Sequence, residues 1–64
     1  MLKFEQFDNE IYITQEDKLY GKIKIIEKKN YYVVFEDDGI KIPECTINGA
    51  KDYVRKHYKE HQPI

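Results

Sequence analysis

Two histidines stand four positions apart near the end of the chain, a spacing that can hold a metal ion on one side of a helix. They are His57 and His61. A structural zinc site needs four ligands, and Cys45 and a few carboxylates are the other candidates. The pattern also lacks the glutamate of a zinc protease. We therefore expect surface histidines, which are favoured near a helix C-terminus by the helix dipole, and no metal site.

The single cysteine and an acidic pair are the other residues with reactive side chains. Cys45 directly precedes a predicted helix, where a thiolate is stabilised. Both histidines lie at the far end of that helix, at least roughly 15 Å away, so we expect no cysteine catalysis within one subunit. Asp37 and Asp38 precede Gly39, which is ordinary hairpin-turn chemistry. Without a nucleophile and base pair or a phosphate-binding loop, the sequence predicts neither an enzyme nor a cofactor.

Alternation of apolar and polar residues predicts the elements that position these groups. Residues 2–5, 11–14, 19–27, 31–36 and 40–42 read as strands, separated by turns that include residues 28–30 and 37–39. From Thr46, a plausible N-cap, apolar residues recur every three or four positions, which predicts a helix over residues 47–61. We expect one α+β domain over residues 1–64, an antiparallel meander of four to five strands with one C-terminal helix packed on one face.

The middle of the chain resembles a known family of small domains. The run from Tyr20 to Ile23, Tyr-Gly-Lys-Ile, followed by residues 32–39, looks like the middle strands of SH3-like barrels of the Tudor kind. The resemblance implies an alternative fold, an SH3-like small barrel with a C-terminal helix. Residues 31–57 are also similar to the sheet-and-helix arm-binding domains of some phage-type integrases.

The strand over residues 31–36 is apolar on both faces, although one helix can cover only one of them. Interior Gly21 suggests a bulge or bend in the preceding strand, and a slip there would move Tyr20, Lys22 and Lys24 to the other face. The predicted core consists of Ile23, Ile25, Val33, Phe35, Ile40 and Ile42 against Ile47, Ala50, Val54 and Tyr58. The predicted opposite face carries Tyr20, Lys22, Lys24, Ile26, Tyr32, Val34 and Lys41.

This tyrosine and lysine face is the best functional candidate in the sequence. It can serve as a protein interface, because tyrosine gives a large contact area at low entropic cost. It can also stack bases and contact phosphates, or lysine stems can simply cover apolar sheet surface. The predicted partner-binding residues are Tyr20, Lys22, Lys24, Tyr32, Val34 and Lys41. A basic helix face, formed by Lys51, Arg55, Lys56 and Lys59, is the alternative.

Size and composition narrow the function further. The 64 residues include 11 basic and 12 acidic ones, a net charge of −1 that does not favour nucleic acid. Mean hydropathy is −0.80, and neither a membrane span nor a signal peptide is expected, so we expect a cytoplasmic protein. Abundant Lys, Ile and Tyr are typical of AT-rich genomes, including phages.

We therefore expect a small non-enzymatic binding module, phage or mobile-element encoded. It would dock on a protein, for example as an inhibitor of a host or defence protein, and form a homodimer through the face of Tyr32 and Val34. A nucleic-acid-binding domain that uses the same face or the basic helix is the alternative. No membrane partner is expected.

Overall fold

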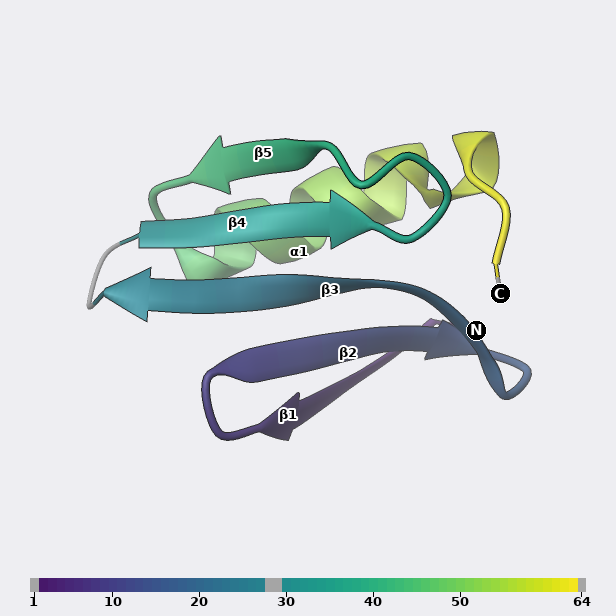
Figure 1. The fold of residues 1–64 in the computed structure, drawn as a ribbon, viewed down its shortest axis with the longest axis horizontal. Coiled ribbons are helices and arrows are strands. Elements are labelled where there is room, and N and C mark those ends of the chain that lie inside the picture. Colours follow the sequence, from purple (N-terminus) through teal and green to yellow (C-terminus); the bar gives the residue numbers. More distant parts are fainter. Residues whose placement is uncertain (1, 28–29, 64) are drawn as a thin grey trace.

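The computed structural model describes residues 2–27 and 30–63 and has five strands followed by one helix (Figure 1). The strands are β1 (Lys3–Phe7), β2 (Glu10–Gln15), β3 (Lys18–Glu27), β4 (Asn30–Phe35) and β5 (Lys41–Glu44). The helix α1 (Ile47–His57) continues into a single 3₁₀ turn, η1 (Tyr58–Glu60). Each strand pairs antiparallel with the next, in the order β1-β2-β3-β4-β5. The meander is confirmed, and the sheet is open, so the barrel alternative is wrong.

Positive φ angles shape the short turns between strands. Glu16 and Asp17, between β2 and β3, have φ of 54° and 64°, the paired values of a tight hairpin turn. Gly39 has φ of 68°, and its amide donates to the carbonyl of Phe35 over 2.9 Å. The predicted turn at residues 28–30 includes Lys28 and Lys29, which lie outside the described residues.

A bulge in β3 moves one predicted site residue to the other face. Ile13 pairs with Gly21 and Thr14 with Leu19, so Tyr20 is the extra residue between two regular pairs. Tyr20 consequently packs toward the helix, with its ring 5.6 Å from that of Tyr58 in an edge-to-face contact. The prediction that Tyr20 lies opposite the helix is wrong, because the bulge breaks the alternation on which it depended.

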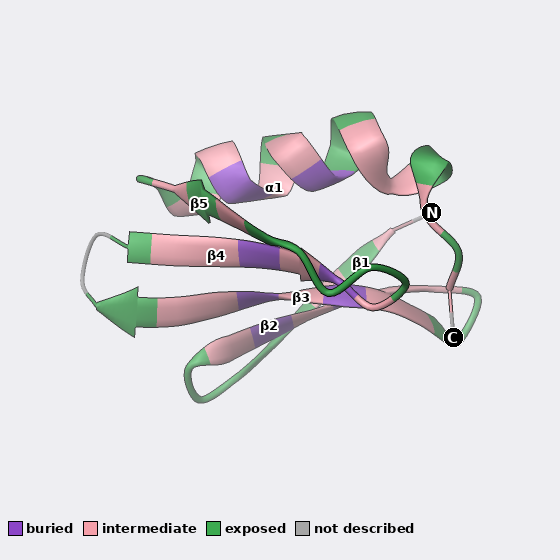
Figure 2. Cartoon of the chain, turned by 45° about the horizontal axis from the view of Figure 1, so that its top comes forward, coloured by how far each residue is buried: buried purple, intermediate pink, exposed green. Residues whose placement is uncertain are grey.

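The core lies between the sheet and α1 (Figure 2). Its buried residues are Ile11, Ile13, Ile23, Val33, Phe35, Ala50 and Val54. Five of these were predicted, whereas Ile11 and Ile13 were missed because β2 was not assigned to a face. Ile25 is only half-buried, and Ile42, Ile47 and Tyr58 pack at the edge of the core. Ile40 is 57% exposed, so its prediction as core is wrong. It follows the turn at Gly39 and precedes β5, where alternation does not apply.

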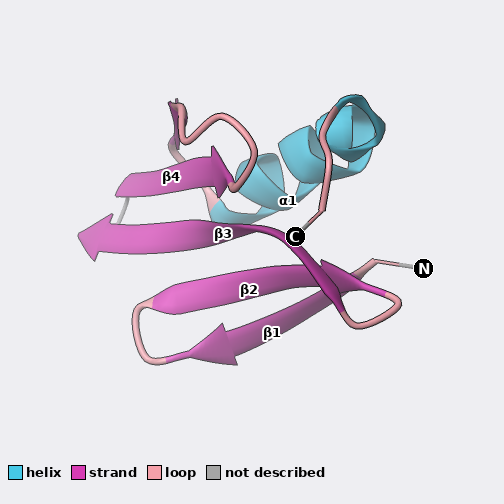
Figure 3. Cartoon of the chain, turned by 45° about the vertical axis from the view of Figure 1, so that its right-hand side comes forward, coloured by secondary structure: helices cyan, strands magenta, loops and turns pink. Residues whose placement is uncertain are grey.

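The helix begins where the sequence predicts. Thr46 is its N-cap, and the hydroxyl oxygen accepts a hydrogen bond from the Gly49 amide over 2.9 Å. The helical segment ends at Glu60, and His61 caps the final turn. Figure 3 shows α1 on one side of the sheet, where it contacts β4 and β5. The other side of the sheet is therefore left without a helix, and the described segments contain no second one.

Candidate functional site

The side of the sheet opposite α1, which we call the outer face, gathers aromatic, aliphatic and charged side chains from all five strands. It is turned toward the viewer in Figure 1, with α1 behind the sheet. Strand register places its residues in two rows across the sheet. The first row is Glu5, Tyr12, Lys22, Val34 and Lys41, and the second is Phe7, Glu10, Lys24, Tyr32 and Pro43. Ile26, the extra residue of a second irregularity in β3, lies beyond the second row.

Several of these side chains contact one another within the outer face. The rings of Phe7 and Tyr12 meet edge to face with centroids 5.4 Å apart. The ammonium of Lys22 lies 5.6 Å from the Tyr12 centroid and 3.8 Å from a carboxylate oxygen of Glu10. The ammonium of Lys22 therefore lies over an aromatic ring, and its charge is partly balanced by a carboxylate of the neighbouring strand. The charge of Lys22 is consequently less available to a partner.

One end of the outer face is hollowed, and its lining mixes apolar and charged side chains. Two large hydrophobic side chains there, Phe7 and Ile26, are each 55% exposed. They line a groove of about 460 Å³ at the end of the sheet where β1 turns into β2. The groove's full lining is Phe7, Asp8, Asn9, Glu10, Tyr12, Lys24, Ile25 and Ile26. An open hollow with an apolar rim and flanking charges is the kind of surface that proteins use to contact one another.

The structure brings together most of the residues that the sequence predicts for partner binding. Lys22, Lys24, Tyr32, Val34 and Lys41 share the outer face, whereas Tyr20 does not. The sequence reasoning missed the contributions of β1 and β2, which are Glu5, Phe7, Glu10 and Tyr12. The sequence of β2 does indicate its outer residues. Ile11 and Ile13 alternate with Glu10 and Tyr12, and since the isoleucines suit the core, Glu10 and Tyr12 must lie on the opposite face.

The alternative basic helix face is not a single free surface. Lys51 and Arg55 lie over the ring of Phe4, at 5.6 and 5.3 Å from its centroid. Arg55 also pairs with Asp52 over 3.0 Å. Lys56 and Lys59 remain exposed. Two of the four cations therefore cover the sheet's first strand, which weakens this helix as a nucleic-acid site.

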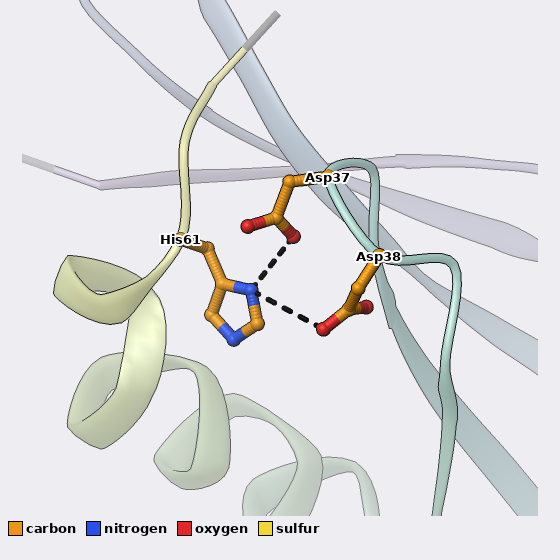
Figure 4. A group of neighbouring side chains, drawn as sticks. All are labelled: Asp37, Asp38 and His61. Carbon is orange, nitrogen blue, oxygen red and sulfur yellow. Dashed lines mark hydrogen bonds and ion pairs between the residues drawn. The ribbon is translucent and has the colours of Figure 1, made fainter.

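A second cluster joins the turn after β4 to the segment that follows η1 (Figure 4). Nδ1 of His61 lies 2.7 Å from one carboxylate oxygen of Asp37 and 3.7 Å from one of Asp38. The other oxygen of Asp37 accepts the amide of Gln62 over 3.2 Å. The hydrogen bond from His61 lowers the pKa of the Asp37 carboxyl from its ordinary value of 3.8, and the Gln62 amide contributes to the same effect.

These contacts tie the end of the chain to the turn after β4, and we call the group Asp37, Asp38 and His61 the clasp. The imidazole of His61 also stacks on Phe35, with centroids 3.7 Å apart and planes 5° apart. The three side chains offer ligand atoms within 4.8 Å of one another, an arrangement that can accept a divalent cation. Both oxygens of Asp37 already accept hydrogen bonds, and Asp38 accepts the amide of Ile40 over 2.9 Å. These hydrogen bonds make the clasp a tether between the turn after β4 and the segment after η1.

The remaining reactive groups are dispersed. Nδ1 of His57 is 3.5 Å from Glu60, and its ring lies against Tyr53 with centroids 4.3 Å apart. The two histidines thus contact different acids. Cys45 is exposed between β5 and α1, beside a hollow lined in part by Tyr31 and Tyr32.

No protein-family model, curated protein or solved structure matches this chain. Within the described residues, no helix is long and apolar enough to cross a membrane.

Proposed function

We propose that the chain is a small binding module without catalytic activity, which docks on a protein through the outer face. One observation carries the proposal. Among the residues that the structure describes, the seven buried hydrophobic ones all belong to the helix or to the side of the sheet that faces it, yet Phe7, Tyr12, Ile26, Tyr32 and Val34 are presented on the opposite side. No described element covers that side. Apolar surface of this kind on a small domain is stabilised by contact with another macromolecule.

The charges of the outer face favour protein over nucleic acid. Glu5 and Glu10 lie in the same two rows as the lysines, and Glu10 is paired with Lys22. Carboxylates on the contact surface repel a phosphate backbone, and nucleic-acid binding gains its affinity chiefly from unpaired cations. A mixed apolar, aromatic and oppositely charged surface is typical of protein interfaces. Inhibition of a host or defence protein is one role that such docking would serve.

Site-specific photocrosslinking in cells that express the chain tests this proposal. A photoreactive residue at position 32 or position 12 should give a discrete adduct that is digested by protease and resists nuclease. The same residue at position 59, which is exposed on η1, is the matched control and should give none. A nuclease-sensitive adduct at positions 12 and 32 would favour the nucleic-acid alternative. Adducts from position 59 alone would refute the outer face as the docking surface.

A further inference from the structure

The charged residues in the two rows of the outer face are sorted by strand. The acidic ones, Glu5 and Glu10, belong to β1 and β2, on one side of the sheet. The basic ones, Lys22, Lys24 and Lys41, belong to β3 and β5. Lys3, on β1, and Glu27, on β3, lie outside the two rows, at opposite ends of the sheet. Within the two rows, the outer face thus has an acidic half and a basic half, divided along the strand direction.

The charges at the two edges of such a surface are complementary to each other in one orientation. If two copies face each other about a two-fold axis that runs along the strands, β1 of one copy lies over β5 of the other. Glu5 then meets Lys41, which occupies the same row at the opposite edge of the sheet. If the axis instead runs across the strands, β1 lies over β1 and β5 over β5, so Glu5 and Lys41 stay apart. Lys22 and Lys24 belong to the middle strand, which lies over the same strand of the other copy in either arrangement, so they do not distinguish the two. The charges at the two edges therefore distinguish the two arrangements.

Resting on the protein-docking function proposed above, we infer that the partner of the outer face is a second copy of this chain, related by a two-fold axis along the strands. The apolar residues support the same arrangement. It brings Tyr12, on β2, over β4 of the other copy, where Val34 occupies the same row, and it brings Phe7, on β1, over Pro43 on β5. The exposed groove at the acidic half is then covered by the aromatic and aliphatic side chains of the basic half.

The size of the face sets the expected strength of the pair. The molecule measures 30 × 20 × 18 Å, and Figure 1 looks onto the sheet along the shortest of these axes. The outer face then offers at most roughly 600 Å² per copy and roughly 1,200 Å² in a pair, the lower end of the range for specific interfaces. We therefore expect a dimer with a dissociation constant in the micromolar range.

Two charge reversals at the edges of the sheet test both the partner and the axis. Glu5 and Lys41 are exposed, so neither Glu5→Lys nor Lys41→Glu should disturb folding. Each single variant should raise the dimer dissociation constant about fivefold at low salt, because each reversal acts at two symmetry-related contacts. The double variant Glu5→Lys/Lys41→Glu restores opposite charges and should return the constant to within about twofold of the wild-type value.

Sedimentation equilibrium gives these dissociation constants directly, and thermal unfolding verifies that each variant is folded. Lys56→Glu and Glu60→Lys make the same changes of charge on the helix side and should leave the constant unchanged. A wild-type chain that stays monomeric up to about 1 mM, well above the expected micromolar constant, would overturn the inference. The inference would also be overturned if neither single reversal changed the dissociation constant, or if the double variant dimerised as weakly as the single variants.

The two proposals fail in distinguishable ways. If the purified chain is monomeric while position 32 crosslinks to a different protein in cells, the docking function stands and the second copy is excluded. If position 32 forms no adduct with a second copy or with a different protein, the proposed docking function is refuted. Both the docking function and the second copy are supported if position 32 gives an adduct of twice the 7.8 kDa mass of the chain and the double variant Glu5→Lys/Lys41→Glu recovers the wild-type dissociation constant.

Discussion

The two faces of this sheet differ in what covers them more than in how apolar they are. On the inner face, Ile23, Val33 and Phe35 are buried beneath Ala50 and Val54 of the helix. On the outer face, neighbouring positions on the same strands carry Tyr32 and Val34 with no helix above them. A chain of 64 residues with a single helix can cover one side of a five-stranded sheet and no more. The inner face therefore provides stability, whereas none of the described elements covers the outer face.

Two phenylalanines on opposite faces give the largest expected contrast. Phe35 is 2% exposed and contacts the helix, whereas Phe7 is 55% exposed at the edge of the outer face. Phe35→Ala should lower the free energy of unfolding by about 3–5 kcal/mol, because it leaves a cavity in the core. Phe7→Ala should lower it by less than about 1 kcal/mol. Chemical denaturation of both variants measures the contrast, and equal losses would contradict the assignment of the two faces.

A substitution at Gly21 tests how closely β3 and β4 must approach each other beneath the helix. A Cβ atom at this position would collide with the carbonyl oxygen of Val34 and lie 2.9 Å from the Cα of Phe35. Gly21→Ala should therefore cost about 1–3 kcal/mol of unfolding free energy through backbone displacement. Gly39→Ala is the comparison, since that site is open and only its positive φ of 68° opposes a side chain. A neutral Gly21→Ala variant would show that β3 and β4 can separate.

Tyr32→Glu separates the docking role of the outer face from its contribution to folding. The sheet is open, so a charge at this half-buried position remains in contact with water. We expect a loss of unfolding free energy below about 1 kcal/mol, together with loss of self-association. Denaturation of the dilute protein and sedimentation at high concentration measure the two effects. An unfolded variant would mean that Tyr32 belongs to the core, and a folded variant that still associates would exclude this face as the interface.

The smallest expected effect concerns the clasp, beside the inner face. The pKa of Asp37 is lowered in the folded chain by the His61 hydrogen bond, so the clasp stabilises the fold fully above pH 3.8. That contribution declines as the pH falls below 3.8 and is lost once the pH passes the lowered pKa. His61→Phe keeps a ring on Phe35 but removes the donor, and it should raise the pKa of Asp37 toward 3.8. An NMR titration of the Asp37 carboxyl carbon measures this shift, and an unchanged titration would show that His61 is not the cause.

Local patterns in the sequence were sufficient for the secondary structure and for much of the core. Alternation, turn residues and the change of spacing at Thr46 predicted four to five strands and the start of the helix, because each depends on residues within a few positions of one another. The same alternation placed Lys22, Lys24 and Tyr32 together on one face. These assignments hold wherever a strand is regular and its neighbours pair in register.

Only the tertiary structure decided the features that depend on irregular or distant pairings. The bulge at Tyr20 follows from how β3 pairs with β2, and no pattern within β3 specifies which residue is the extra one. The meeting of Asp37 with His61 joins residues 24 positions apart, because the segment after η1 packs against the turn after β4. The division of the outer face into acidic and basic halves likewise arises from strand order. Sequence patterns report what one segment prefers, whereas register and packing determine which segments meet.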